Sequence, residues 1–133
     1  MTNKKIGNDF EQELCEKLSS YGFWVHNLAL NKSGQPADII AVRNKVAYLI
    51  DAKVVRSSRG FSLSRIEENQ DLAMDMWGSK GNGQGWFALK VKEEIYMIPH
   101  FCMKAYMVQQ ASLSLSEIFT LGKPLEKWVT RCK

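Results

Sequence analysis

Two aspartates in this chain have the spacing of a metal-dependent hydrolytic centre. Asp38 precedes one apolar run and Asp51 follows the next, with a short polar break between the two runs. This pattern is typical of a β-hairpin with Asn44 in the turn. If the loop consists of Asn44 and Lys45, the register places Asp38 directly opposite Asp51. Their Cβ atoms would then lie about 4.5–5.5 Å apart.

Two carboxylates at that separation repel, and a divalent cation between them would reverse the sign of the interaction. Lys53 lies two residues beyond Asp51, so it projects from the same face of the strand. An ammonium there can neutralise charge on a phosphate or position a water molecule. In the ordinary alternative, Asp38 caps a strand edge while Asp51 and Lys53 form a solvated pair. Two observations argue against this alternative. Asp51 and Lys53 interrupt an otherwise apolar strand, and a second acid, Asp38, lies in register with Asp51.

Positive charge is concentrated around this candidate centre. The whole 133-residue chain carries a net charge of +4, whereas the segment 43–65 alone carries +5. The segment has a single acid, Asp51, and six basic residues: Arg43, Lys45, Lys53, Arg56, Arg59 and Arg65. A basic belt beside a candidate metal site favours a polyanion as partner. A solvated loop that happens to contain several arginines is the alternative.

Length and composition indicate one globular domain over 1–133, with 45% hydrophobic residues. No apolar run approaches the ~20 residues that span a bilayer, and no signal-peptide core is present, so we expect a cytoplasmic protein without a membrane partner. The three cysteines are far apart and lack zinc-site spacing. The glycine-rich segment 78–85 does not match a phosphate-binding fingerprint, so no nucleotide cofactor is expected.

Helical spacing predicts a first helix over 3–21, with an apolar stripe that ends at Tyr21. Glu11 lies at the margin of this stripe and could reach the sheet, although a solvated helix face is the default for such a glutamate. A strand over 23–28 and a turn-rich loop over 31–36 precede the hairpin.

After the hairpin, a polar and flexible loop is expected over 56–60. Ser64 and Glu67 match a capping box and predict a second helix over about 65–77. Gln70 falls near the inward side of that helix, from which it could reach Asp51, although a half-exposed glutamine is the commoner case. The remaining predicted elements are a hairpin of 86–91 and 94–98, a helix over 100–110 and a short helix around 116–121.

This order predicts an α/β domain with a central mixed sheet of about five strands flanked by helices. With its candidate residues on these elements, the chain resembles the PD-(D/E)XK nucleases, which have the restriction-endonuclease-like fold. Within them it is similar to the archaeal-type Holliday junction resolvases and to the RecU-type resolvases of bacteria and phages. The resemblance covers roughly residues 5–100 and rests on short motifs in the right order: Gly7–Glu11, Gly22–Val25, Ser33–Ala41, Leu49–Lys53 and Trp86–Leu89.

The resemblance implies a role for each site residue. Glu11, Asp38 and Asp51 would ligate Mg²⁺, or Mn²⁺, together with the Ala52 carbonyl. Lys53 would assist the attacking water and Gln70 would help to orient the site. Ser33 would contact DNA beside the scissile strand. Asp51 is a departure, since glutamate is commoner there in the resolvases.

The implied activity is metal-dependent cleavage of four-way DNA junctions by a homodimer, in the cytoplasm, or in the host cytoplasm if the chain is viral. The basic belt would bind the phosphate backbone through Arg43, Lys45, Arg56, Arg59 and Arg65, with Ser33 beside them. Two alternatives stay open. One is another DNA nuclease of this superfamily, restriction-like or acting on flaps or ends. The other is a non-catalytic DNA-binding or inhibitory protein on the same fold.

Overall fold

A computed structural model describes residues 2–28 and 37–132. Ser33 and the whole of the loop predicted over 31–36 therefore lie outside the described residues. The elements are α1 (Asn3–Ser20), β1 (Trp24–Asn27), β2 (Ile39–Arg43), β3 (Val46–Val55), β4 (Phe61–Ser62), the 3₁₀ turn η2 (Leu63–Arg65), α2 (Glu68–Ser79), β5 (Trp86–Val91), β6 (Glu94–Pro99), α3 (His100–Gln109), β7 (Ser112–Leu113), α4 (Leu115–Leu121), β8 (Lys123–Pro124) and α5 (Leu125–Arg131).

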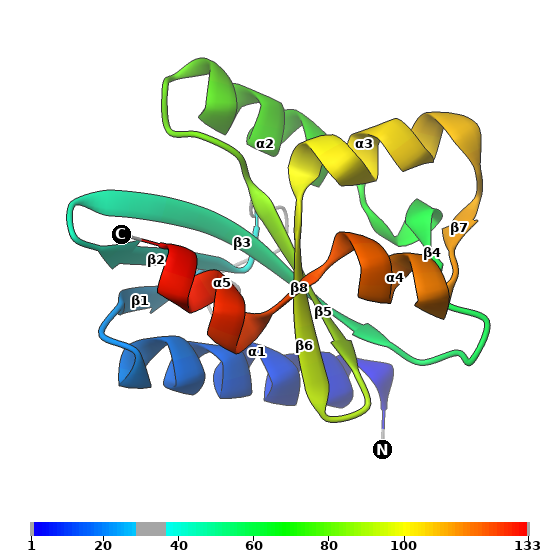
Figure 1. The fold of residues 1–133 in the computed structure, drawn as a ribbon, viewed down its shortest axis with the longest axis horizontal. Helices are drawn as coiled ribbons and strands as arrows, with labels where there is room; N and C mark the ends of the chain where they lie inside the picture. Colours follow the sequence, from blue (N-terminus) through cyan, green and yellow to red (C-terminus); the bar gives the residue numbers. More distant parts are fainter. Residues whose placement is uncertain (1, 29–36, 133) are drawn as a thin grey trace.

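One mixed sheet organises the molecule, in the order β1-β2-β3-β5-β6-β8 (Figure 1). Its strands pair antiparallel except β3 and β5, which run parallel. The predicted mixed sheet with flanking helices is confirmed. Six strands are present in the described part of the chain where about five were expected, because the two-residue β8 adds to β6.

The two faces of the sheet carry separate apolar cores. α1 and α5 cover one face, where Leu14 and Trp128 pack against Ile50 and other strand residues. α2, α3 and α4 cover the other face, where Met74 packs near Leu49 (Figure 1). Neighbouring residues of a strand point to opposite faces, so β3 contributes to both cores. In the part of the chain that the structure describes, no helix is long and apolar enough to cross a membrane.

The β2–β3 hairpin has the predicted register. Asn44 and Lys45 both have positive φ, of 53° and 70°. This backbone matches the type I′ turn that suits a two-residue loop. The ladder runs from the residues beside the turn to Ile39 opposite Ile50. Asp38 lies one residue before β2, and its N–H donates to the Ile50 carbonyl at 3.2 Å. The hydrogen bonding between the two strands therefore continues one residue beyond Ile39, which brings Asp38 beside Asp51.

The start of α2 corrects the sequence prediction. Ser64 lies in η2, and Ile66 leaves it with extended backbone (φ −85°, ψ 110°), so helix cannot begin at 65. The helix begins at Glu68, with Glu67 as its N-cap. Gln70 accepts the Glu67 N–H at 3.2 Å through its Oε1, which is half of a capping box three residues later than predicted.

One smaller prediction is also wrong. Tyr21 was expected to complete the buried stripe of α1, but it lies at the helix end and is exposed. The segment 56–60 is a loop as predicted, and it forms a turn closed by a bridge between Ser57 and Gly60. The Ser57 carbonyl accepts the Gly60 N–H at 3.1 Å. This turn joins β3 to β4.

Candidate active site

Asp51 is the centre of the candidate site. It lies on β3 with a side chain that is 0% exposed. Its Oδ1 accepts a hydrogen bond from Gln70 Nε2 at 3.0 Å. Lys53 Nζ lies 3.1 Å from Oδ2, close enough for an ion pair. Apart from this ion pair, Oδ2 has no hydrogen bond of regular geometry among the described residues. A buried carboxylate oxygen without such a bond is costly.

Asp38 lies beside Asp51 at the end of the β2–β3 ladder. Its Oδ2 accepts the Ala52 N–H at 2.8 Å, which fixes the carboxylate against β3. Burial is the largest cause that raises the pKa of Asp51 well above its ordinary value, and the charge of Asp38 raises it further, whereas Lys53 lowers it. The structure therefore brings the two predicted carboxylates together.

Glu11 faces the same centre from α1, although its carboxylate and those of Asp38 and Asp51 do not all lie within 4.8 Å of one another. Burial raises the pKa of Glu11 to about 7, with a further increase from Asp38 and an opposing decrease from Lys53. These influences place the Glu11 carboxyl within electrostatic reach of the pair on the sheet. Sequence reasoning missed Cys15, one helical turn later on the same side of α1. Its pKa is raised to about 11 by burial, then by Glu11 and Asp38, so the thiol stays protonated beside the site.

The donors suit a hard divalent cation. Mg²⁺ and Mn²⁺ prefer carboxylate and carbonyl oxygens, and Asp51 Oδ2 is a buried oxygen without a hydrogen-bond donor. The N–H and C=O of one strand residue point to the same side, so the Ala52 carbonyl is directed toward the side where its N–H meets Asp38. The residues present therefore fit the metal that the sequence resemblance implies.

The candidate DNA-binding residues do not all lie together in the structure. Arg43 donates to the backbone carbonyls of Tyr21 at 3.0 Å and Val129 at 2.7 Å, and also to that of Cys132. These bonds hold β2 against the C-terminal helix. Because the Arg43 side chain is engaged within the protein, we do not include it among the residues proposed to bind DNA. Lys45 is exposed in the hairpin turn, about 20 Å along β3 from Asp51.

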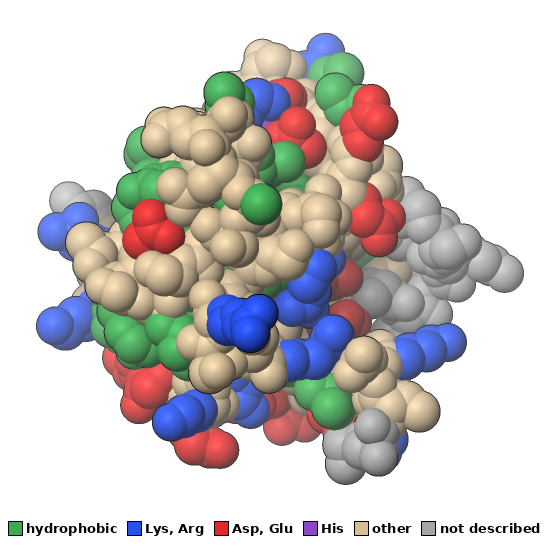
Figure 2. All heavy atoms as spheres, turned by 90° about the vertical axis from the view of Figure 1, so that its right-hand side faces the viewer, with side chains coloured by type: hydrophobic (Ala, Val, Ile, Leu, Met, Phe, Trp, Pro, Cys, Tyr) green, Lys and Arg blue, Asp and Glu red, His purple; other side chains and the backbone are tan. Residues whose placement is uncertain are grey.

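Arg56 and Arg59 are exposed in the turn after β3, and Arg65 is half-buried beside them. Figure 2, which faces the end of the molecule where β4 and β7 lie, shows Lys and Arg side chains gathered near its centre. Of the predicted basic belt, these three arginines line one pocket near the end of β3, the strand that carries Asp51.

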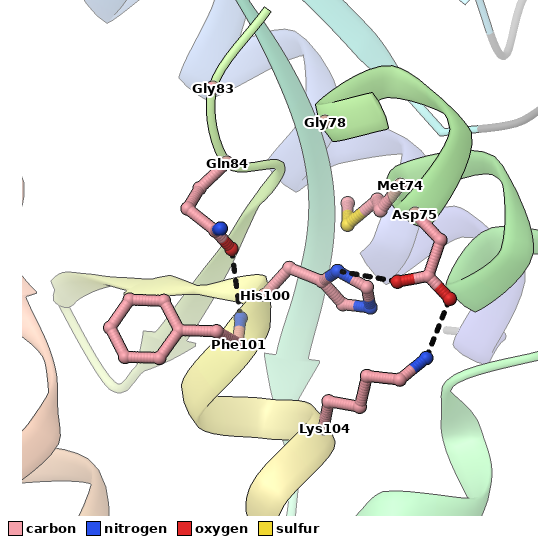
Figure 3. A pocket seen from close by; sticks show the side chains of 8 residues that line it. All are labelled: Met74, Asp75, Gly78, Gly83, Gln84, His100, Phe101 and Lys104. Atoms are coloured by element: carbon pink, nitrogen blue, oxygen red, sulfur yellow. Dashed lines mark hydrogen bonds and ion pairs between the residues drawn. The ribbon is translucent and has the colours of Figure 1, made fainter. Parts of the chain in front are cut away.

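A second cluster of ionisable residues lies between α2 and α3. Asp71, Asp75 and His100 offer three possible metal ligands within 4.8 Å of one another. His100 Nε2 lies 2.6 Å from Asp71 Oδ1, and Lys104 Nζ lies 2.6 Å from Asp75 Oδ2. Figure 3 shows Lys104 and His100 both directed toward Asp75 at the wall of a pocket of about 330 Å³. Lys104 and His100 already pair with both acids, so this cluster has partners within the protein whether or not a metal is bound.

The mixed sheet and its flanking helices have the restriction-endonuclease-like fold. A solved structure of Hjc, a Holliday junction resolvase from Archaeoglobus fulgidus, has a TM-score of 0.64 with this chain at 17% identity, and covers 93% of this chain and 95% of its own. The model of the archaeal Holliday junction resolvase (Hjc) family matches residues 2–127. The chain therefore belongs to the archaeal Holliday junction resolvase family, a family of junction-resolving nucleases. No curated protein sequence matches it.

Proposed function

We propose that this chain cuts four-way DNA junctions by metal-dependent phosphodiester hydrolysis at the Asp38–Asp51 site. The observation that carries the proposal is the buried Asp51 carboxylate, whose Oδ2 has no hydrogen-bond donor among the described residues. Asp38 lies beside it and Lys53 Nζ is 3.1 Å away. Such an arrangement is unfavourable by itself and becomes favourable when a cation is present.

Glu11, Asp38, Asp51 and the Ala52 carbonyl would hold the cation, with Mg²⁺ as the expected ion and Mn²⁺ as a substitute. When bound, the ion would polarise a phosphate oxygen and lower the pKa of a coordinated water. Hydrolysis requires a water oxygen to attack the phosphorus atom while the bond from phosphorus to the leaving oxygen breaks. The protein residues must hold the phosphate and the water in line for this displacement.

The roles of the remaining residues follow from their contacts. Lys53 carries the ammonium nearest to Asp51 and is 15% exposed, so it can approach a phosphate at the surface and stabilise developing negative charge. Gln70 holds Asp51 Oδ1 and leaves Oδ2 available. The protonation of Glu11 changes near neutral pH, so its carboxyl can exchange a proton for the cation.

The substrate would be recognised by its shape. Lys45, Arg56, Arg59 and Arg65 provide cations for the phosphate backbone, and contacts of this kind carry little sequence information. The single chain offers one such catalytic site, whereas resolving a junction requires paired cuts in two strands. A homodimer with two-fold symmetry would place two copies of the site on opposed strands.

The test is cleavage of a labelled synthetic four-way junction, with a linear duplex of the same sequence as the control substrate. Each would be incubated with Mg²⁺, with Mn²⁺ and with chelator. Asp51→Asn keeps the shape of the side chain and removes its charge. Asp9→Asn is the matched control, because Asp9 is an exposed acid on α1 that pairs with Lys5.

We expect paired, metal-dependent nicks in opposed strands of the junction, lost in Asp51→Asn and retained in Asp9→Asn. Cutting of the linear duplex at the same rate would contradict junction specificity. Binding without cutting under either metal would contradict the catalytic proposal.

A further inference from the structure

A pocket of about 350 Å³ lies at the end of β3, beside η2 and β7. Three guanidinium groups and three hydroxyl groups line it: Arg56, Arg59, Arg65, Ser57, Ser62 and Ser112. No carboxylate and no aromatic side chain is among its lining residues in the part of the chain that the structure describes. Its donors therefore suit an anion that has several oxygens, and not a nucleobase, which would need a stacking surface.

The arginines of this pocket have no acidic partner among the described residues. None of the three forms an ion pair there. The pKa of Arg65 is lowered by burial and then by the charge of Arg56. Guanidinium groups held this close repel each other, and a bound anion would remove that cost.

Arg65 is fixed in place before any ligand arrives. Its Nη1 donates to the Val54 carbonyl at 2.7 Å, and its guanidinium lies 5.1 Å from the centre of the Phe61 ring. Val54 follows Lys53 directly on β3. Arg65 is thus anchored to the strand that carries the catalytic residues, so a group bound in the pocket keeps a constant distance from the site.

The turn that carries the other two arginines is also fixed. Ser57 Oγ accepts the Arg59 N–H at 3.0 Å. Gly60 has a φ of +118°, and a Cβ there would lie 1.9 Å from the Leu113 carbonyl oxygen. Only glycine allows this close approach to β7. The backbone of the turn is therefore held against β7, and a ligand does not have to order it.

We propose that this arginine pocket binds one backbone phosphate of the DNA strand that is cut, separate from the scissile phosphate. Arg56 lies five positions after Asp51 along nearly extended chain, which corresponds to about 16 Å. At this distance Arg56 and Arg59 would hold a phosphate other than the one that reacts, although Arg65 is within electrostatic reach of Asp51. The bound phosphate would fix the position of the strand, so Arg56 and Arg59 are positioning residues. This inference rests on the proposed function, because it requires DNA as the ligand.

The experiment combines a phosphate scan with arginine variants. A set of four-way junctions would carry a single neutral methylphosphonate at successive positions around the cleavage point. Binding of each junction would be measured in chelator, where no cleavage occurs. The variants are Arg56→Gln and Arg59→Gln, since both side chains are exposed and the fold does not depend on them. Arg131→Gln, an exposed arginine on α5 with the same change of charge, is the control.

For the wild-type protein, we expect one methylphosphonate position, or two neighbouring ones, to weaken binding roughly tenfold. Arg59→Gln should weaken binding to the unmodified junction by a similar factor and should be insensitive to the methylphosphonate at that same position. Arg131→Gln should keep the wild-type pattern. Arg59→Lys should recover only part of the affinity, because an ammonium cannot form the bidentate contact.

Equal sensitivity of wild type and both pocket variants at every position would overturn the inference, as would equal losses in Arg59→Gln and Arg131→Gln. Cleavage in Mg²⁺ separates this failure from failure of the proposed function. If the wild-type protein cuts junctions but the pocket variants show no position-specific loss, only the pocket assignment fails. If the position-specific loss appears without cleavage, the pocket stands and the catalytic proposal fails.

Discussion

Gln70 Nε2 donates a hydrogen bond to Asp51 Oδ1 at 3.0 Å, while Gln70 Oε1 accepts the backbone N–H of Glu67 at 3.2 Å. One amide therefore closes the first turn of α2 and fixes the buried carboxylate of β3. The two contacts use opposite ends of the amide, so its orientation is determined. This arrangement couples the start of a helix to the position of a candidate metal ligand.

Gln70→Ala should therefore cost both stability and activity. The substitution removes a helix-capping acceptor and the hydrogen bond that Gln70 donates to Asp51 Oδ1, so we expect a loss of about 1–3 kcal/mol in the free energy of unfolding. Denaturant unfolding in chelator measures it. Junction cleavage should fall as well. Gln109→Ala, which removes an exposed glutamine at the end of α3, is the matched control, and an equal loss of cleavage there would contradict a specific role for Gln70.

Asp51→Asn should separate stability from activity. In the metal-free protein, burial and the neighbouring Asp38 oppose the charge of Asp51, so removal of that charge should raise the free energy of unfolding by about 1 kcal/mol at pH 8. Metal-dependent cleavage should be lost. Thermal unfolding in chelator and in Mg²⁺ measures the stability, since Mg²⁺ should stabilise the wild-type protein more than the variant, and junction cleavage in Mg²⁺ measures the activity. A variant that is markedly less stable than wild type in chelator would show that Asp51 serves the fold.

The hairpin at the site could be predicted because its signals are local. Alternating apolar runs and a two-residue turn fix the register from Asn44 back to Ile39, and this register brings Asp38 near Asp51. The start of α2 was predicted three residues early, because a capping box at Ser64 and the real N-cap at Glu67 look alike in sequence. Tertiary packing of Ile66 selects between them, and this packing is not visible locally.

Contacts between distant segments could not be predicted. Arg43 looked like a DNA-binding residue, but its partners include the carbonyl of Val129, 86 residues away. The pairing of His100 with Asp71 depends on how α3 packs beside α2. Neither side chain carries a signal in its neighbouring sequence that reveals these partners. Residue type and local charge therefore identified the basic segment, whereas the fold decides which of its members face a ligand.

Glu11 should give the metal-free protein a characteristic dependence on pH. Its pKa is raised from 4.5 to about 7, chiefly by burial. Between these values the folded protein holds a proton that the unfolded chain has released, so the contribution of Glu11 to stability falls as pH rises from about 4.5 to 7 and stays constant above. Glu11→Gln should remove this fall. Thermal unfolding of both proteins in chelator across pH 4–9 measures it, and parallel curves would contradict the raised pKa.

Asp71 should stabilise the fold without taking part in cleavage. Burial raises the pKa of Asp71, but hydrogen bonds from His100 and Lys104 outweigh this effect and hold the pKa below its ordinary value of 3.8. Asp71→Asn should therefore lower the free energy of unfolding by about 1–2 kcal/mol at neutral pH. The difference from wild type should disappear as pH falls below 3.8 through the folded pKa, because both proteins are then neutral at this position.

Unfolding at pH 7 and pH 3 measures the difference, and junction cleavage should keep its metal dependence. If Asp71→Asn instead lost metal-dependent cleavage while its stability was unchanged, the cluster of Asp71, Asp75 and His100 would hold the catalytic metal in place of the Asp38–Asp51 pair.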